Sequence, residues 1–221
     1  MNQQTQSRQA DDKDIKFTGV RGAIAQHMMH SLQQSAQLTY MGDACIDGLL
    51  ADRQARSERG EKLSPEVYLI KAVSQTLSQH PDFNGVTSVD HYTLSESHNI
   101  AIAVSSPIGL VTVTLREVNT LALEEISEMR RQLLDKAMKG LLKPSDMSGG
   151  TFTISNLGGR PIRYFTPILN AKQIAILGIG KTLTTPMIDK NGELYVSQQL
   201  PLSLTTDHRV VDGDPDLIPI N

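Results

Sequence analysis

The sequence has no tryptophan, only 4% aromatic residues and a single cysteine among its 221 residues. It also has no Lys/Arg-rich run, so neither a base-stacking surface nor the basic patch of a nucleic-acid-binding protein is expected. The single cysteine, Cys45, excludes an intrachain disulfide and favours a reducing compartment, the cytoplasm. Apolar runs fall short of the roughly 20 residues that span a bilayer, and the N-terminal residues lack the apolar core of a signal sequence, so no membrane partner is expected.

Metal-ligand spacing is missing as well. The six histidines are scattered, and His27 and His30 have no companion carboxylate or cysteine at ligand spacing, so no metal site is predicted. Cys45 has no neighbouring base that would make it a nucleophile. We interpret it as a small buried apolar residue.

The overall composition is that of a folded globular protein. Hydrophobic residues make up 39% and charged residues 20%, with a formal net charge of -3. Residues 1–14 are polar and predict a disordered arm, because they contain almost nothing to bury. Residues 15–221 are long enough for one domain with a sizeable core.

Hydrophobic periodicity predicts helices over 19–35, 48–57, 65–80 and 121–139. In the first of these, an apolar stripe recurs every four residues at Val20, Ile24, Met28 and Leu32. Ser64 before Pro65 predicts a capped start of the third helix, with the Ser64 side chain as the cap.

Strands are predicted at 37–46, 91–96, 99–106, 109–116, 151–155, 173–180 and 194–206. Residues 107–109 are a plausible turn between two of them, and the stretch Asp189–Gly192 contains the Asn-Gly pair of a hairpin turn. The mixture of helices and antiparallel pairings indicates a single α+β domain with helices on a mixed sheet.

Two short segments contain the candidate chemistry. His208 stands where an apolar strand meets the turn residues Asp212 and Gly213, which is where a sheet delivers a side chain to a cleft. In GGTFTISNLGG (149–159), a strand leads Ser155 and Asn156 into a glycine-bearing loop, where a hydroxyl can donate to an oxyanion. Taken singly, the His208 pattern more often marks a histidine without a role, and the Ser155 pattern also fits a serine that caps a turn.

Together, GGTFTISNLG and DHRVVDG resemble the catalytic domain of the dihydrolipoamide acyltransferases, the E2 components of 2-oxo acid dehydrogenase complexes. The segments VRGAIAQHMMHS, NIAIAVSSPIGLVTV and FTPILNAKQIAILGIGK resemble other parts of that domain, so the likeness extends from about residue 15 to Gly213. It implies the fold of chloramphenicol acetyltransferase, assembled as a homotrimer with active sites between subunits. Coenzyme A and a dihydrolipoyl group, held on a separate domain or protein, would enter from opposite ends.

The resemblance also implies roles for individual residues. His208 would take the proton of the thiol that attacks the acyl thioester, and Ser155 of a neighbouring subunit would stabilise the oxyanion. Asp212 would be mainly structural, paired with Arg21. Contacts with coenzyme A would fall on Arg53, Ser64, Ser105, Ser155, Asn156, Gly180 and Thr182.

The sequence departs from the family pattern in several places. Ser105 stands where the family commonly has Asp, and Gly22 and His27 stand where Arg or Lys is frequent. The family continues after the DHRVVDG motif with a helix that packs on the domain, whereas Pro215 and Pro219 oppose a helix here. A lipoyl domain is not visible in this sequence, so a lipoyl-bearing domain would act in trans.

Three functions therefore compete. The leading one is an acyltransferase that moves an acyl group between coenzyme A and a dihydrolipoyl thiol. The second is a stand-alone acyl-coenzyme A-dependent acyltransferase with a small-molecule acceptor. The third is a catalytically inactive core protein that only assembles, an interpretation that intact His208 and Ser155 oppose.

Overall fold

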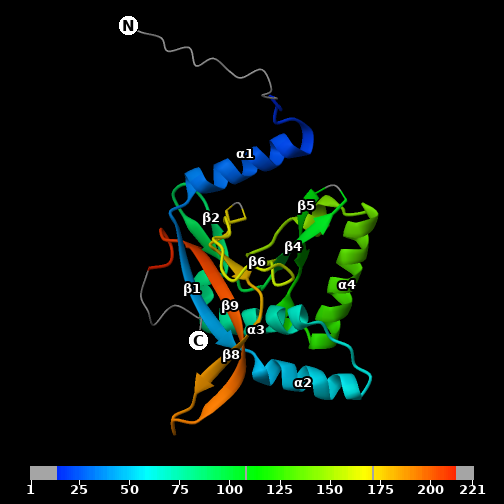
Figure 1. Cartoon of the computed structure of the whole chain (residues 1–221). Helices are drawn as coiled ribbons and strands as arrows, with labels where there is room; N and C mark the ends of the chain where they lie inside the picture. Colours follow the sequence, from blue (N-terminus) through cyan, green and yellow to red (C-terminus); the bar gives the residue numbers. More distant parts are fainter. Residues whose placement is uncertain (1–13, 108, 171, 213–221) are drawn as a thin grey trace.

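The computed structural model of the protein describes residues 14–212, except residues 108 and 171. A seven-stranded mixed sheet forms its centre, in the order β1-β9-β7-β6-β4-β5 with β8 paired to β9 (Figure 1). This confirms the predicted α+β architecture. The strands of the sheet are β1 (Gln37–Cys45), β4 (Ile100–Ser106), β5 (Gly109–Leu115), β6 (Phe152–Asn156), β7 (Ala175–Ile179), β8 (Leu183–Ile188) and β9 (Leu194–Asp207). A separate pair consists of β2 (Gly85–Thr87), absent from the sequence prediction, and β3 (Tyr92–Leu94).

The longest strand, β9, organises the sheet. Its 14 residues pair antiparallel with β1 on one side and with β8 and then β7 on the other. β7 is parallel to β6, which is parallel to β4. All five residues of β7 are buried, as its continuous apolar run predicts. Because β9 runs against β6 and β7, its C-terminal end lies at the sheet edge where those two strands begin.

The predicted helices are confirmed as α1 (Gly19–Gln34), α2 (Asp47–Glu58), α3 (Pro65–Gln79) and α4 (Leu123–Lys139), and a short α5 (Pro144–Met147) follows. α3 and α4 pack against each other and bury Ile70 and Ile126 completely in the core. Gly140 ends α4 in the left-handed conformation, with φ of 68°, which glycine adopts without steric cost. Among the described residues, no helix is long and apolar enough to cross a membrane.

Residues 157–170, which follow β6, run over the sheet. Two glycines make this close approach possible, one within β7 and one directly after it. A Cβ on Gly178 would lie 2.8 Å from the ring of Phe165, and one on Gly180 would lie 1.9 Å from the carbonyl oxygen of Arg163. Any larger residue at position 180 would therefore displace backbone rather than a side chain.

The apolar stripe of α1 is largely uncovered within one chain. Of its 16 residues only Ser31 is buried, and Val20 and Leu32 are 58% and 46% exposed. The Ser31 hydroxyl donates to the carbonyl of Leu169 at 2.7 Å and so fastens the helix to the body of the domain. Within one chain, α1 lies across one end of the domain (Figure 1) with most of its apolar side chains uncovered.

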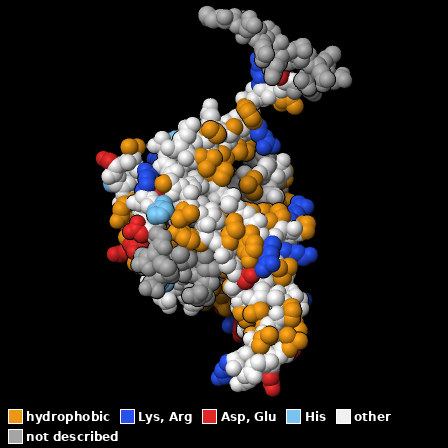
Figure 2. All heavy atoms as spheres, turned by 60° about the vertical axis from the view of Figure 1, so that its left-hand side comes forward, with side chains coloured by type: hydrophobic (Ala, Val, Ile, Leu, Met, Phe, Trp, Pro, Cys, Tyr) orange, Lys and Arg blue, Asp and Glu red, His pale blue; other side chains and the backbone are white. Residues whose placement is uncertain are grey.

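The β8–β9 hairpin is a second surface with uncovered apolar residues. The predicted turn at Asp189–Gly192 is confirmed, with a hydrogen bond of 3.0 Å from Gly192 N to Asp189 O. The register pairs Ile188 with Leu194, and these two side chains are 70% and 73% exposed. Figure 2 shows the hydrophobic side chains gathered on this projection at the bottom of the molecule.

Cys45, at the end of β1, was interpreted from the sequence as buried, and this is wrong. The residue is exposed and its thiol is free. Its sulfur lies 3.4 Å from Asp47 Oδ2 and 3.4 Å from Ser197 Oγ. The reason is that β1 shows an alternating burial pattern, so every second residue points outward.

His98 is a buried polar residue that joins the start of β4 to α3. Only 5% of it is exposed, and its Nδ1 lies 2.8 Å from Ser74 Oγ. Burial lowers the pKa of His98, because the charged imidazolium loses its solvation. The unfolded chain therefore binds this proton more readily than the folded chain does.

We predict that the free energy of unfolding falls as the pH drops from about 7.5 to about 5.5, since the unfolded state takes up a proton near pH 6.5 that folded His98 resists. Chemical denaturation at both pH values measures this. In His98→Gln the pH dependence should shrink, whereas the exposed control His30→Gln should retain it. An unchanged pH dependence in His98→Gln would contradict the assignment.

Candidate active site

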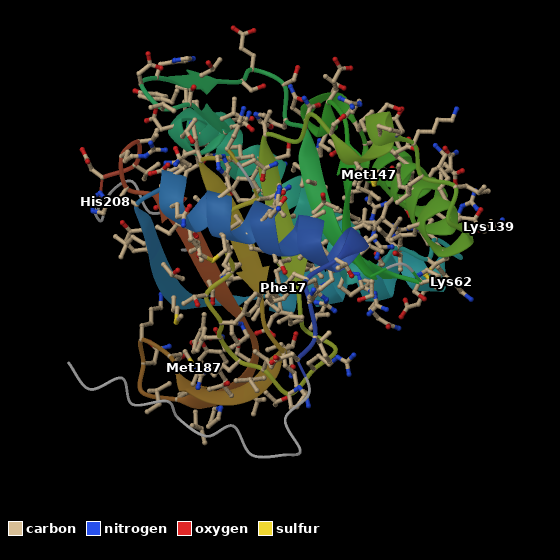
Figure 3. All side chains as sticks on the ribbon, turned by 90° about the horizontal axis from the view of Figure 1, so that it is seen from above. Phe17, Lys62, Lys139, Met147, Met187 and His208 are labelled. Atoms are coloured by element: carbon tan, nitrogen blue, oxygen red, sulfur yellow. The ribbon has the colours of Figure 1, made fainter. Side chains whose placement is uncertain are left out.

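The C-terminal end of β9 presents His208. The strand ends at Asp207, and the His208 backbone N–H donates to the Ala36 carbonyl at 2.8 Å, which ties the turn to the segment between α1 and β1. The His208 side chain is exposed, at the edge of the molecule (Figure 3). Within the described residues its imidazole makes no hydrogen bond, so both ring nitrogens are available to a ligand.

Asp207, which the sequence argument did not select, holds this turn together. Its Oδ1 accepts hydrogen bonds from Ala36 N at 3.2 Å and from Arg209 Nε at 3.0 Å, and its Oδ2 accepts from an Arg209 terminal nitrogen at 2.6 Å. Burial acts to raise the pKa of Asp207, but these hydrogen bonds outweigh it and the pKa lies below its usual value. The carboxylate is fully buried, and it stays ionised because Arg209 and the backbone N–H groups stabilise its charge.

The signal for Asp207 was present in the sequence. Asp207 ends a predominantly apolar strand, and an arginine follows two residues later. A carboxylate buried in such a place needs a counter-charge, which the arginine can supply. The pairing became recognisable only once the turn brought Arg209 back onto Asp207. This contact gives Arg209 a structural part in the turn.

The C-terminal end of β6 presents Ser155. The serine is half-buried and is paired in the parallel ladder with Gly178 of β7. Within the described part of the chain its hydroxyl has no hydrogen-bond partner. It is therefore free to donate to a ligand, as the sequence argument requires.

Residues predicted to contact coenzyme A gather near Ser155. Asn156 and Gly180 lie at the same sheet edge, because β6 and β7 are parallel and Asn156 pairs with Ile179. Ser105 reaches this edge on β4, which runs parallel to β6. Thr182 follows Gly180 by two residues at the start of β8.

Arg53 and Ser64 are placed together at the start of α3. The Arg53 Nε–H donates to the carbonyl of Leu63 at 3.2 Å. Ser64 is the N-cap residue of α3, but the predicted side-chain cap is wrong: the Ser64 hydroxyl makes no capping hydrogen bond and has no partner, although its oxygen is buried. The side chain of Asn156 links this group to β6, since its Nδ2 lies 3.2 Å from Glu66 Oε1.

His208 and Ser155 are far apart within one chain. Ser155 pairs with Gly178, which pairs with Ser203 of β9. His208 lies five residues beyond Ser203, and β9 is two strands away from β6, so the two residues are separated by roughly 16 Å along the strands and about 10 Å across them. Figure 3 places His208 and Lys62, which is two residues before Ser64, on opposite sides of the molecule.

Asp212 does not pair with Arg21 within the chain. Arg21 lies near the start of α1, and about 20 Å of helix separates it from Gln34, the end that approaches the His208 turn. Asp212 is exposed and has no ion-pair partner among the described residues. Inside one chain, Asp207 rather than Asp212 holds the His208 turn.

An apolar cavity lies apart from His208 and Ser155. This cavity, of about 310 Å³, lies between α3 and the sheet, and neither His208 nor Ser155 lines it. Over residues 14–212, apart from the two omitted positions, no group of three or more His, Cys, Asp or Glu side chains could hold a metal ion.

Comparison with known structures defines the class of the fold. A chloramphenicol acetyltransferase matches with a TM-score of 0.51 and 18% identity, over 85% of this chain and 87% of that one, and so shows the same fold. The dihydrolipoamide acetyltransferase of Azotobacter vinelandii matches with a TM-score of 0.84 and 31% identity, over 92% and 86% of the two chains. Its structure was studied for the roles of a serine, a histidine and an asparagine in its catalytic mechanism.

Sequence comparison identifies the family. Residues 9–216 match the model of the 2-oxoacid dehydrogenases acyltransferase (catalytic domain), and this chain belongs to that family. It is 34% identical over 90% of its length to the acetyltransferase component of the pyruvate dehydrogenase complex of Bacillus subtilis. It is 33% identical over 91% to the succinyltransferase component of the 2-oxoglutarate dehydrogenase complex of Haemophilus influenzae. The matched region spans 46% and 50% of those two relatives.

We predict that Asp207→Asn destabilises the fold by roughly 2–4 kcal/mol, because it leaves the guanidinium of Arg209 without its buried counter-charge. Asp135→Asn is the control: Asp135 pairs with Lys139 on the surface, with a side chain 53% exposed, and its loss should cost no more than about 0.5 kcal/mol. Urea denaturation measures both. Equal small effects would show that Asp207 does not hold the turn.

Proposed function

We propose that this chain catalyses acyl transfer between coenzyme A and a dihydrolipoyl thiol, with each active site built from two subunits. The main support is that His208 and Ser155 project from opposite edges of one sheet, each without a hydrogen-bond partner among the described residues. Side chains about 20 Å apart cannot act on one carbonyl carbon. A neighbouring copy supplies the missing half in each case, and membership of the acyltransferase family supports this arrangement.

The reaction in such a site is a general-base-catalysed thioester exchange. A thiol with a pKa near 8.5 is only a few per cent ionised at neutral pH, so a base that removes its proton raises the concentration of the attacking thiolate. His208 takes this proton, and the thiolate attacks the carbonyl carbon of the acyl thioester. Ser155 donates a hydrogen bond to the oxyanion of the tetrahedral intermediate. The intermediate then expels the second thiolate, which receives the proton from His208.

The group around Ser155 suits coenzyme A. Arg53 uses its Nε–H on the Leu63 carbonyl, and its two terminal nitrogens, which have no partner among the described residues, suit a phosphate. The buried Ser64 hydroxyl without a partner is a second donor at the same helix start. Gly180, directly after β7, lets the Arg163 backbone approach closely, and it lies at the same edge as Asn156, Ser105 and Thr182.

Asp212 fits a structural role at the subunit interface. In the Azotobacter vinelandii protein the serine precedes the histidine by about fifty residues, and the asparagine follows the histidine by four. Ser155, His208 and Asp212 follow the same order with similar spacing. Exposed on its own chain, Asp212 is free to meet a cation such as Arg21 of another copy.

The assembly we propose is a homotrimer, with a lipoyl-bearing domain acting in trans. Its support is the apolar surface that a single chain leaves uncovered on α1 and on the β8–β9 hairpin, including Val20, Ile188 and Leu194. Exposed apolar surfaces of this kind mark protein–protein contacts. The domain boundary near residue 15 and a cytoplasmic location remain predictions, and residues 1–13 and 213–221 lie outside the described residues.

We predict that the protein transfers an acyl group from acyl-coenzyme A to dihydrolipoamide, and that His208→Ala lowers kcat by roughly 10²–10⁴-fold. Thioester formation with acetyl- and succinyl-coenzyme A, monitored spectrophotometrically, measures this and ranks the acyl groups. Transfer only to a hydroxyl or amine acceptor would favour the stand-alone acyltransferase instead. No transfer by a protein that still trimerises would favour the assembly role.

A second prediction tests the shared site directly. Ser155→Ala should lower kcat roughly 10²–10³-fold, and neither it nor His208→Ala should be active alone. After joint refolding in equal amounts, about a quarter of sites should combine an intact His208 with an intact Ser155 from another chain, restoring a matching share of activity. A mixture as inactive as its components would contradict a site made from two subunits.

A further inference from the structure

Glu66 joins three elements at the edge where β6 ends. It occupies the second position of α3. Its Oε1 accepts a hydrogen bond from Asn156 Nδ2 of β6 at 3.2 Å, and its Oε2 accepts a hydrogen bond from Arg130 Nε of α4 and forms an ion pair with the same guanidinium. The side chains of Glu66 and Arg130 are only 13% and 23% exposed. From the sequence, Glu66 was only an acid near the positive end of the helix dipole.

The charge balance explains how a carboxylate persists there. A poorly solvated anion is costly unless it is paired and hydrogen-bonded, and Arg130 supplies both. One carboxylate oxygen is then occupied by the guanidinium. The other is left to hold Asn156.

The hydrogen bonds of Asn156 determine its orientation. Its Oδ1 accepts from the Gly158 backbone N–H at 2.9 Å, and its Nδ2 donates to Glu66. A carboxylate only accepts and a backbone N–H only donates, so the amide cannot be reversed without losing both contacts. Asn156 is thus held on one side by its own loop and on the other by α3.

Ser155 inherits this rigidity. It directly precedes Asn156, so in an extended strand its side chain points to the opposite face of the sheet. Its backbone is paired with β7 on one side. Its hydroxyl has no hydrogen bond that could orient it among the described residues, so its direction depends on how firmly the end of β6 is held.

We propose that Glu66 is a positioning residue of the acyltransferase, which holds Asn156 and thereby aims the Ser155 hydroxyl at the oxyanion. This inference rests on the proposed function. Donors of this type act through preorganised geometry, and a displacement of about 1 Å is enough to cost a large factor in rate.

The test is steady-state kinetics of the intact protein with acetyl-coenzyme A and dihydrolipoamide. Glu66→Ala should lower kcat by about 10–100-fold while the KM for acetyl-coenzyme A changes less than about 3-fold, because the lost interaction aims a transition-state donor. Glu66→Gln keeps an acceptor for Asn156 and should recover most of the lost rate. The matched control is Glu128→Ala, which removes a carboxylate bound to Arg131 and Gln132 on the exposed face of α4 and should leave kcat unchanged.

A double-mutant cycle separates aiming from general weakening of the fold. In a Ser155→Ala background, Glu66→Ala should cause little further loss, because the group that it aims is gone. Losses that multiply in the double variant, or a wild-type rate in Glu66→Ala, would overturn the proposal while leaving the proposed function intact. A wild-type protein without thioester exchange would instead overturn the proposed function, and the role of Glu66 with it. If the melting temperature shows that Glu66→Ala does not fold, the kcat of Glu66→Gln decides the question. A kcat well above that of Ser155→Ala supports the proposal, and a kcat as low as that of Ser155→Ala contradicts it.

Discussion

The antiparallel pairing of β9 with β7 determines the rest of the molecule. β9 is the one strand of the sheet that pairs with three others along its length, and its register with β7 places His208 at the edge where β6 and β7 begin. Since Ser155 lies where β6 ends, the two candidate side chains leave the sheet in opposite directions. In the proposed function, a single chain therefore contains two halves of a site and no complete one.

Each half is supported by a buried or partly buried carboxylate that is paired with an arginine. At one edge Asp207 accepts hydrogen bonds from Ala36 and Arg209 and holds the His208 turn. At the other edge Glu66, paired with Arg130, holds Asn156 beside Ser155. Both ion pairs act on backbone that would otherwise be free to shift, and both leave the reactive side chain itself without a partner.

The uncovered apolar surface agrees with the proposed division of the site between two subunits. A chain that completes its site with a neighbour needs surfaces by which to hold that neighbour. α1 has a regular apolar stripe, but its exposed Val20 and Leu32 show that the stripe does not serve the core of its own chain. The pattern was correctly recognised as a helix, but periodicity reports an apolar face and not the identity of what covers it.

The sequence alone predicted most of the helices and strands of this protein and the candidate side chains of its proposed site. Local rules suffice for these: apolar periodicity located the helices, Asn191–Gly192 located the hairpin, and the motifs around Ser155 and His208 indicated an acyltransferase. Tertiary structure alone decided that Cys45 is exposed, that the Ser64 hydroxyl caps nothing, and that Asp207 rather than Asp212 holds the His208 turn within a chain. It also placed His208 and Ser155 at opposite edges of the sheet. These facts depend on strand register and on contacts between residues distant in sequence, which no local pattern encodes.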